Sequence, residues 1–244
     1  MMTTILDQLQ QPEQIQHLTQ DELLQLAQEC RERVIQVTSQ TGGHLASSLG
    51  TVEITIALFN VFNFKYDRII WDVGHQAYIH KLLTNRNEKF LSLGKKDGIK
   101  KFLSRSESEY DHFGAGHAST SISAGVGMSI ARDLKQEDHR HVISIIGDGA
   151  LTGGLAFEAL NHNGYLNKNM IVILNDNGMS IDPNVGALSK IITRVISSKS
   201  YNSLREQTWK LSGKFPFAET SRMALHKINA SLKSFLTPRH AFEQ

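Results

Sequence analysis

Apolar side chains recur at helical spacing over the early part of the chain, after a polar, glutamine-rich start. Thr19 and Glu22 form a capping-box pattern, in which the threonine accepts a hydrogen bond from a free backbone N–H and the glutamate reaches back. This pattern predicts that a helix begins at Thr19, and the glycine pair after Thr41 predicts that it ends there. A second helix is predicted from about Val52 to Phe62.

Short, uninterrupted apolar runs predict three buried strands, over residues 68–72, 141–146 and 170–174. Helical patterns over 119–134 and 153–164 precede the second and the third of these strands. A strand, a helix and a strand within about 35 residues form a βαβ unit, which requires a parallel sheet covered on both faces. The predicted fold class is therefore α/β, with a mostly parallel sheet and helices on both faces. Gly125 and Gly127 are among the small residues that would let the 119–134 helix pack closely against a neighbouring backbone.

The remaining parts of the chain carry weaker patterns. Residues 85–113 are rich in Lys, Ser and Glu, so we expect a surface excursion in which Glu107, Glu109 and Asp111 face solvent. Arg105 in the same stretch is a lesser candidate for binding phosphate. Beyond Pro183 the pattern is irregular, with helical stretches expected near 186–196 and 218–236.

Composition and charge narrow the class of protein. The chain has 244 residues, of which 40% are apolar and 20% charged, as is ordinary for a globular domain. A formal net charge of +2 without a basic stripe disfavours nucleic-acid binding, and no apolar run reaches the length of a membrane span. The single cysteine, Cys30, excludes an internal disulfide framework and favours a reducing compartment. Because the N-terminus also lacks a signal-peptide pattern, we expect a cytoplasmic protein that binds neither nucleic acid nor membrane.

Two polar motifs follow the second and third predicted strands. Asp148 lies between Gly147 and Gly149, and Asn177 comes just after the third strand. Since the carboxyl ends of parallel strands share one edge, where ligands of such sheets bind, Asp148 and Asn177 should lie together. The helix after Asp148 offers backbone N–H groups to phosphate, and a carboxylate beside a phosphate requires a cation between them. The oxygens of Asp148, of the Asn177 side chain and of the Met179 backbone carbonyl suit Mg²⁺.

A dinucleotide-binding turn is the competing interpretation of the same glycines. Gly147, Gly149 and Gly153 are spaced one residue away from the Rossmann fingerprint, and Asp176 stands where a ribose-binding acid would. An acid inside the phosphate turn would repel pyrophosphate without a metal, and the unit begins far into the chain, so this interpretation is disfavoured. A zinc site is also disfavoured, because Cys30 is alone and the sequence has no His-Glu-x-x-His motif.

Three of the eleven histidines lie in glycine-flanked turns. These are His44, His75 and His117, and their position in turns favours a functional role. Most of the other histidines, His80 among them, are expected to be ordinary structural or surface residues, whereas the role of His112 stays open.

Taken together, these motifs resemble a known family. Gly147-Asp148-Gly149 followed by Asn175-Asp176-Asn177 resembles the thiamin diphosphate motif of the transketolase superfamily. The resemblance is closer still to the 1-deoxy-D-xylulose-5-phosphate synthases, and it covers roughly Leu26 to Phe242. Gly178 departs from the synthase pattern, which usually has glutamate there, and makes this point more similar to transketolase. The supporting runs are residues 41–44, 70–78, 105–111, 116–124 and 147–152.

The resemblance implies a site for thiamin diphosphate and Mg²⁺. It implies that Asp148, Asn177 and the Met179 carbonyl bind the metal, and that Gly149 and Ala150 hold the diphosphate. It also implies that His44 and His75 are catalytic, because they would face the reacting carbons, where a histidine near neutrality shuttles protons. The implied cofactor-binding residues are His75, Gly116, His117, Ala118, Gly149, Ala150 and Asn177.

The family joins pyruvate to D-glyceraldehyde 3-phosphate with loss of CO₂, toward isoprenoid and thiamin precursors, and its members form homodimers. In the family, a glutamate from a second domain contacts the aminopyrimidine ring of the cofactor. We expect residues 1–244 to be an N-terminal diphosphate-binding domain that lacks its C-terminal strand, with the pyrimidine-binding and C-terminal domains absent. The chain alone is then expected to be inactive. The alternatives are an inert truncated product and the N-terminal subunit of a split transketolase, and a truncated synthase is favoured over a natural split subunit.

Overall fold

The computed structural model describes residues 4–175, which belong to the first of two compact units, Met1–Val185 and Gly186–Gln244. Three parallel strands form the centre of this unit: β1 (Arg68–Trp71), β2 (Val142–Gly147) and β3 (Ile171–Asn175). Their order in the sheet is β1-β2-β3. The three predicted strands and their parallel arrangement are confirmed. The helices predicted near 186–196 and 218–236, and the question of a further strand near the C-terminus, lie outside the described residues.

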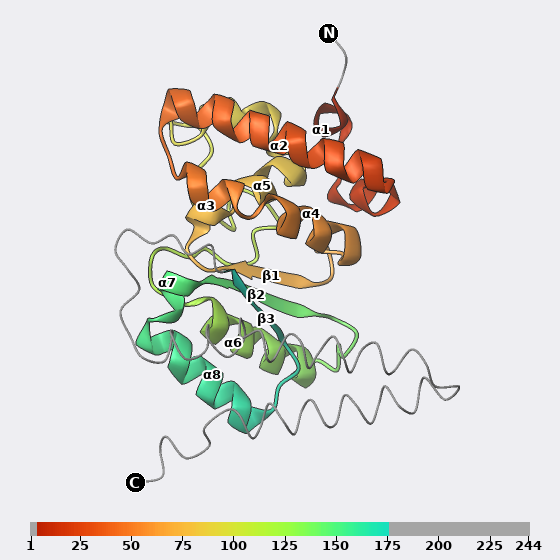
Figure 1. Ribbon diagram of the computed structural model, residues 1–244. Coiled ribbons are helices and arrows are strands. Elements are labelled where there is room, and N and C mark those ends of the chain that lie inside the picture. The colour runs from red at the N-terminus through yellow and green to blue at the C-terminus, as the bar shows by residue number, and fades with distance from the viewer. Residues whose placement is uncertain (1–3, 176–244) are drawn as a thin grey trace, which may run out of the picture. The chain divides into compact units, whose positions relative to one another are not determined.

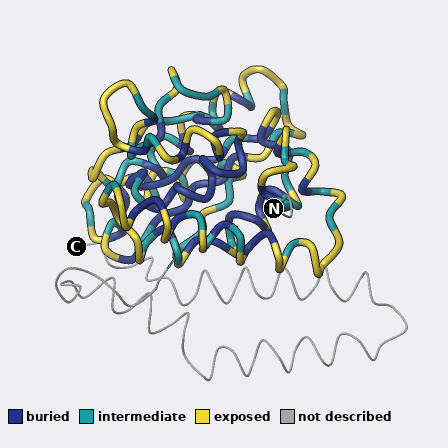
Figure 2. Tube along the Cα trace, turned by 90° about the horizontal axis from the view of Figure 1, so that it is seen from above, coloured by how far each residue is buried: buried dark blue, intermediate teal, exposed yellow. Residues whose placement is uncertain are grey.

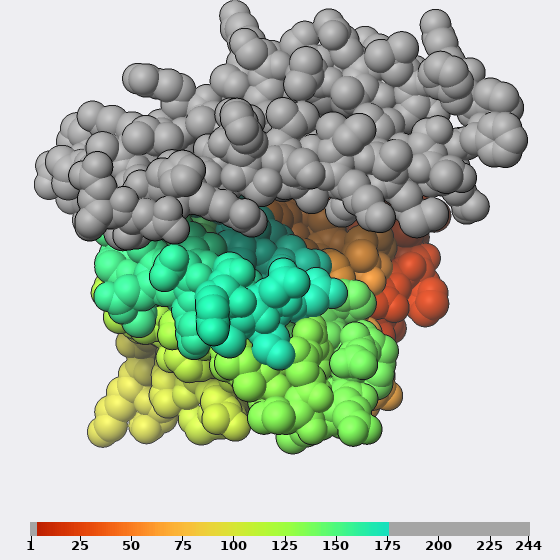
Figure 3. Space-filling model, turned by 90° about the horizontal axis from the view of Figure 1, so that it is seen from below, coloured from red at the N-terminus to blue at the C-terminus, as the bar shows by residue number. Residues whose placement is uncertain are grey.

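Helices cover both faces of the sheet, as the α/β prediction requires (Figure 1). The helices from α1 to α5 lie on one face of the sheet, and α6 and α8 lie on the other (Figure 1). Seen from below, α6 and α8 lie side by side (Figure 3). The helices and helical turns of the first layer are α1 (Ile5–Gln8), η1 (Pro12–His17), α2 (Gln20–Thr41), α3 (Leu45–Leu49), α4 (Val52–Val61), η2 (Gly74–Gln76), α5 (Tyr78–Lys81), η3 (Leu82–Arg86) and η4 (Glu88–Ser92). The later ones are α6 (Ser121–Leu134), α7 (Asp148–Leu151) and α8 (Gly154–Leu166).

The side chains of β2 alternate between the two helix layers. Ile143 and Ile145 belong to the larger core cluster, together with α2, α4, α5 and β1. Ile146 points the other way, into a smaller cluster with α6, α7 and α8. Because successive side chains of a strand point to opposite faces, a strand that is apolar at nearly every position must be covered on both sides. The tube view shows this buried interior surrounded by exposed loops and helix faces (Figure 2).

Helix α2 begins as the capping pattern predicts. Thr19 accepts a hydrogen bond from the Glu22 backbone N–H at 3.3 Å, and Glu22 accepts one from the Thr19 backbone N–H at 2.7 Å. The helix ends at Thr41, and Gly42 follows with a φ of 64°, in the left-handed region that glycine adopts without strain. Buried apolar residues on its inner face include Leu26, Cys30 and Val34.

Close packing of α6 against the sheet depends on one of the two predicted glycines. A Cβ at Gly125 would collide with Ser144 Oγ of β2 and would lie 2.6 Å from Met170 Cε, so only glycine fits there. Gly127 has nothing within 4 Å of where its Cβ would be. The prediction of close packing is therefore confirmed at Gly125 and wrong at Gly127.

The polar stretch 85–113 is not a surface excursion. Its apolar residues Phe90, Leu93, Ile99 and Leu103 are buried in the main core cluster. The prediction failed because these four residues are dispersed among Lys, Ser and Glu in an irregular segment, which has no periodicity to mark an inner face. Within the described residues, no helix is both long enough and apolar enough to cross a membrane.

Candidate active site

The carboxyl ends of the strands bring the predicted motifs to one edge of the sheet. Gly147, the last residue of β2, pairs with Asn175, the last residue of β3. Asp148 therefore follows β2 at the level where the chain leaves β3. Asn177 and Met179, the other two predicted metal ligands, lie outside the described residues.

Asp148 begins a short helix that the sequence pattern did not resolve. It is the first residue of α7 and is 7% exposed, while Gly149 beside it is exposed and Ala150 is half-buried. A carboxylate in the first turn of a helix faces the positive end of the helix dipole. The main chain at Gly149 is thus accessible next to a buried carboxylate, which is the arrangement that a metal-bound phosphate needs.

Three histidines from separate parts of the chain form one cluster. The ring centroids of His44 and His75 are 4.9 Å apart, with their planes at 66°. His75 and His117 stack at 5.4 Å with an interplanar angle of 15°, and His44 lies 6.0 Å from His117. The structure therefore brings together all three histidines that the glycine-flanked turns singled out. His44 and His117 are exposed and His75 is half-buried, so the cluster is open to a ligand.

Hydrogen bonds from the first helix layer fix the backbone around His75. Ser48 Oγ donates to the His75 carbonyl at 2.7 Å, and Thr51 Oγ donates to the Gln76 carbonyl at 2.8 Å. Both hydroxyl-bearing residues are fully buried. Val73, two residues before His75, has a φ of 53°, an unfavourable conformation for a β-branched residue. Strain of this kind persists only where surrounding contacts hold it, and it is concentrated at functional sites.

The segment that carries His117 packs against the turn that carries His75. The Gly74 N–H donates to the Ala115 carbonyl at 3.4 Å. The ring of Phe102 meets the ring of His117 edge-on at 5.4 Å. A Cβ at Gly74 would lie 3.0 Å from the backbone nitrogen of Leu103, so this close approach requires glycine.

A second contact joins the His117 segment to the region after Asp148. A Cβ at Gly153 would collide with the Ser119 hydroxyl, so the chain just after Ala118 lies against the start of α8. Ser119 itself has a φ of 54°. The loop that carries the predicted Gly116-His117-Ala118 segment is therefore next to the turn that follows α7, the short helix of the predicted Gly149-Ala150 segment.

The end of β1 is tied to the start of α6 by a buried acid. Asp72 is fully buried, and its Oδ2 accepts a hydrogen bond from the Ser121 backbone N–H at 2.9 Å. A carboxylate at a helix N-terminus satisfies a backbone donor that has no partner within the helix. This bond fixes the chain on both sides of the histidine cluster, since His75 follows Asp72 and His117 precedes Ser121.

Burial and neighbouring rings set the protonation of His75. Burial, together with the adjacent His44 and His117, lowers the pKa of His75 to about 4. Its imidazole is therefore neutral at physiological pH. Burial also raises the pKa of Tyr78, a contribution that the His44 backbone partly offsets. A Cβ at Gly43 would lie 2.9 Å from the Tyr78 hydroxyl, so this tyrosine supports the turn before His44.

These residues fit a cofactor that carries a diphosphate and an aromatic ring. A buried carboxylate lies beside an exposed glycine backbone, and a neutral half-buried imidazole lies next to two exposed ones. The described part of the chain contains no group of three or more His, Cys, Asp or Glu side chains that is arranged to hold a metal. Of the three predicted Mg²⁺ ligands, only Asp148 is one of these residue types. The other two are the side-chain oxygen of Asn177 and the backbone carbonyl of Met179.

A buried ionic cluster next to β1 went unrecognised in the sequence. Arg86 donates to both carboxylate oxygens of Asp111 at 2.8 Å, and Lys81 pairs with Glu107. Asp111 is 1% exposed and Lys81 is fully buried, so the expectation that Glu107 and Asp111 face solvent is wrong. His80, expected to be ordinary, is fully buried with its Nε2 3.3 Å from Asp111 Oδ1. The sequence signal that could have indicated the cluster is that Glu107 and Asp111 lie four residues apart in a stretch that also contains several large apolar residues.

His112, whose role the sequence left open, is structural. Its Nδ1 accepts from the Ile69 backbone N–H at 3.0 Å, and its Nε2 lies 3.0 Å from the Phe64 carbonyl. Burial and the nearby charge of Arg68 lower the pKa of His112 to about 4. A neutral ring with its proton on Nε2 satisfies both contacts.

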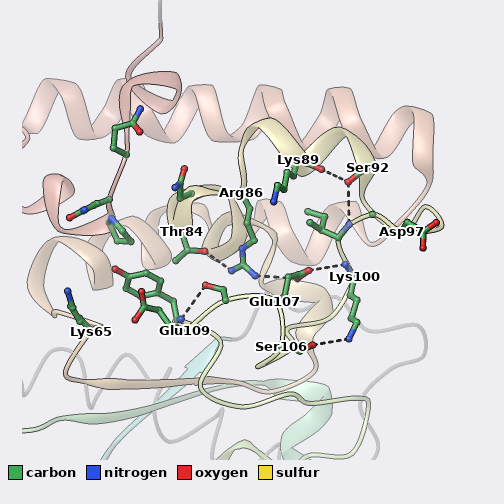
Figure 4. A pocket seen from close by; sticks show the side chains of 18 residues that line it. Lys65, Thr84, Arg86, Lys89, Ser92, Asp97, Lys100, Ser106, Glu107 and Glu109 are labelled. Atoms are coloured by element: carbon green, nitrogen blue, oxygen red, sulfur yellow. Dashed lines mark hydrogen bonds and ion pairs between the residues drawn. The ribbon is translucent and has the colours of Figure 1, made fainter.

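A polar cavity of about 870 Å³ lies elsewhere in the molecule, and none of the predicted site residues lines it (Figure 4). Its wall includes Lys65, Lys89, Lys100 and Glu109, with Arg86 and Glu107 pointing toward one another (Figure 4). The cavity therefore borders the buried ionic cluster rather than the histidine cluster.

Comparison with known proteins identifies the family of the chain. The sequence profile described as 1-deoxy-D-xylulose-5-phosphate synthase matches residues 6–244. The chain is 50% identical over 240 residues to the 1-deoxy-D-xylulose-5-phosphate synthase of Desulfotalea psychrophila, covering 98% of this chain and 37% of the relative. It is 50% identical over 244 residues to that of Carboxydothermus hydrogenoformans, covering all of this chain and 39% of the relative. The chain thus spans less than two fifths of the curated relatives it matches and aligns with their N-terminal part. By this match, the chain belongs to the 1-deoxy-D-xylulose-5-phosphate synthase family.

Proposed function

We propose that this chain supplies the diphosphate- and magnesium-binding half of a thiamin diphosphate-dependent transferase that joins pyruvate to D-glyceraldehyde 3-phosphate with loss of CO₂. The observation that carries the proposal is the convergence of two groups at one sheet edge. The first is Asp148 with the exposed Gly149 backbone, and the second is the cluster of His44, His75 and His117. Membership of the synthase family supports the same activity.

Each predicted residue has a proposed role. Asp148, the Asn177 side-chain oxygen and the Met179 carbonyl would hold Mg²⁺, an ion that prefers hard oxygen ligands and shares phosphate oxygens. Gly149 and Ala150 would hold the diphosphate through the backbone at the start of α7. When bound, thiamin diphosphate supplies the electron sink for breaking and forming the carbon–carbon bonds. The segment Gly116-His117-Ala118 would line the cofactor.

His44 and His75 would act on the reacting groups through their ring nitrogens, as proton carriers or hydrogen-bond partners. The low pKa of His75 keeps its imidazole neutral at physiological pH and makes it a weak base, so its N–H would donate a hydrogen bond to the reacting group. The close contacts at Gly74 and Gly153 would keep the His75 turn and the His117 segment packed against their neighbours.

The proposed setting of the enzyme follows the family. We propose a cytoplasmic homodimer that acts in the supply of isoprenoid and thiamin precursors. A split transketolase, in which a partner chain completes the site, is the alternative. An in-frame continuation past codon 244 would favour the synthase, and a neighbouring gene for the missing half would favour the split enzyme.

Titration calorimetry of the 244-residue chain with thiamin diphosphate, with and without Mg²⁺, tests the proposal. Wild type should bind only when Mg²⁺ is present, and Asp148→Ala should weaken binding by at least about tenfold, or about 1.4 kcal/mol. Asp138→Ala is the matched control, because it removes an exposed carboxylate just before β2, at the opposite edge of the sheet. Equal binding by wild type and Asp148→Ala would refute the metal assignment.

A further inference from the structure

The buried ionic cluster beside β1 contains two cations and two carboxylates from two different segments. Lys81 and Arg86 lie on α5 and η3, soon after β1. Glu107 and Asp111 lie on an irregular segment, residues 102–118, which we call the strap. Arg86 contacts both carboxylates, at 2.8 Å to Asp111 and 3.3 Å to Glu107.

Local backbone geometry turns Arg86 into the interior. Asn85 has a φ of 59° and a ψ of 35°, the left-handed conformation that asparagine tolerates better than most residues. The Arg86 guanidinium then also donates to Thr84 Oγ at 2.6 Å and is 4% exposed. Burial alone would raise the pKa of Asp111, but hydrogen bonds from His80 and Arg86 hold it well below its usual range. The pair is therefore ionised and fully formed.

A buried ionic cluster of this kind adds little to the free energy of folding. Desolvating buried charges costs about as much as their attraction returns, and apolar side chains of similar volume often stabilise a core equally well. A bidentate arginine–carboxylate pair does supply something that apolar contacts lack, namely a defined geometry.

Asp111 and Glu107 fold the middle of the strap into a closed loop. Asp111 Oδ2 accepts a hydrogen bond from the Ser104 backbone N–H at 2.9 Å. Glu107 Oε1 accepts one from the Lys100 backbone N–H at 3.0 Å. Residues 104–111 of the strap are thereby closed on themselves, and Arg86 anchors this loop to the chain that follows β1.

Both ends of the strap reach the histidine cluster. At one end, Phe102 meets the ring of His117 and Leu103 lies against Gly74. At the other end, Ala115 accepts the Gly74 N–H, two residues before His117. His80, which contacts Asp111, also accepts from Trp71 Nε1 at 3.4 Å, at the end of β1. The ionic cluster thus binds the part of the strap that lies, in sequence, between its two contacts with the His75 turn, at Leu103 and at Ala115.

We propose that Arg86 and Asp111 are positioning residues: their bidentate pair holds the strap so that His117 stacks on His75 in the geometry that the cofactor requires. The proposal rests on the proposed function for its link to the cofactor, while the link to the histidine rings stands on the described contacts alone.

Arg86→Lys in the 244-residue chain tests the proposal, because lysine keeps the positive charge but cannot donate to both oxygens of Asp111 as the guanidinium does. Arg132→Lys is the matched control. Arg132 is likewise buried and bonds Asp133 and the Asn169 carbonyl, but it lies in the last turn of α6, and Asn169 comes just before β3, at the opposite edge of the sheet. The readouts are the thermal midpoint, the ring ¹H–¹³C signals of labelled histidines, and the affinity for thiamin diphosphate with Mg²⁺.

Arg86→Lys should shift the ring signals of His75 and His117 and weaken the binding of thiamin diphosphate about tenfold. Arg132→Lys should lose a comparable amount of thermal stability. It should nevertheless leave the histidine signals in place and the cofactor affinity within twofold of wild type. If Arg86→Lys does not fold, Asp111→Asn, which keeps the shape and removes the charge, takes its place with the same expectation. Histidine signals that stay at their wild-type positions in a folded Arg86→Lys or Asp111→Asn protein would overturn the proposal. Signals that shift equally in Arg132→Lys would overturn it too. If the wild-type chain binds no thiamin diphosphate, the proposed function fails, and the histidine signals still decide the positioning role.

Discussion

The backbone N–H of Gly74 donates a hydrogen bond to the carbonyl of Ala115, and this one contact joins the turn of His75 to the strap of His117. It exists because Gly74 has no side chain. The Cβ of any other residue would lie 3.0 Å from the Leu103 nitrogen and 3.1 Å from Phe102 Cα. Both neighbours are backbone atoms, which do not move aside as the end of a flexible side chain does.

Gly74→Ala should therefore lower the free energy of unfolding by about 1–3 kcal/mol, the usual cost of overpacking a well-packed site. It should also separate the strap from the His75 turn and so change the ring signals of His75 and His117. Gly127→Ala is the control, because nothing lies within 4 Å of its Cβ position and alanine favours a helix by up to about 1 kcal/mol. Urea unfolding of both variants measures the effect, and a Gly74→Ala protein as stable as wild type would contradict the predicted contact.

Acid should destabilise the fold through His112. Its pKa is about 4 in the folded chain and near 6.5 when unfolded, so the unfolded chain binds more protons between these values. Stability from this group is complete above pH 6.5 and is lost as the pH falls toward 4. The physical cause is burial of the ring together with the nearby positive charge of Arg68, both of which disfavour the protonated imidazole.

Urea unfolding at pH 7 and pH 5 measures this dependence. His112 alone should remove about 2 kcal/mol of stability between these pH values. His112→Asn should show a flatter dependence on pH, while His139→Asn, which changes an exposed histidine, should follow wild type. A slope that is identical in His112→Asn and wild type would assign the acid sensitivity to other groups.

The 244-residue chain alone should show no turnover of pyruvate and D-glyceraldehyde 3-phosphate. The resemblance to the family implies that a glutamate from another domain contacts the aminopyrimidine ring, and this chain spans less than two fifths of its relatives. Release of CO₂ from pyruvate by the purified chain, at saturating thiamin diphosphate and Mg²⁺, is the measurement. Adding a separately produced partner that carries the remaining domains of a relative is the positive control. Clear turnover without such a partner would disprove the expectation.

Local patterns were enough to predict most of the elements. The capping box at Thr19, the apolar run of β2 and the glycine after Thr41 each act through neighbours in the chain, so their effect is visible in a short window of sequence. The alternation of Ile143 and Ile145 with Ser144 and Ile146 likewise follows from the period of a strand. The motif around Asp148 pointed to the sheet edge, because parallel strands end together.

Tertiary structure alone decided which side chains meet across long separations. The sequence singled out His44, His75 and His117, but their rings form one cluster only because the strap packs on Gly74 and the Ser119 loop packs on Gly153. It also decided that Asp111 is buried against Arg86 and that Glu107 pairs with the buried Lys81, where the sequence predicted that both carboxylates face solvent. The physical reason is that charge burial depends on finding an opposite charge with matched geometry, and that partner lies in another segment of the chain.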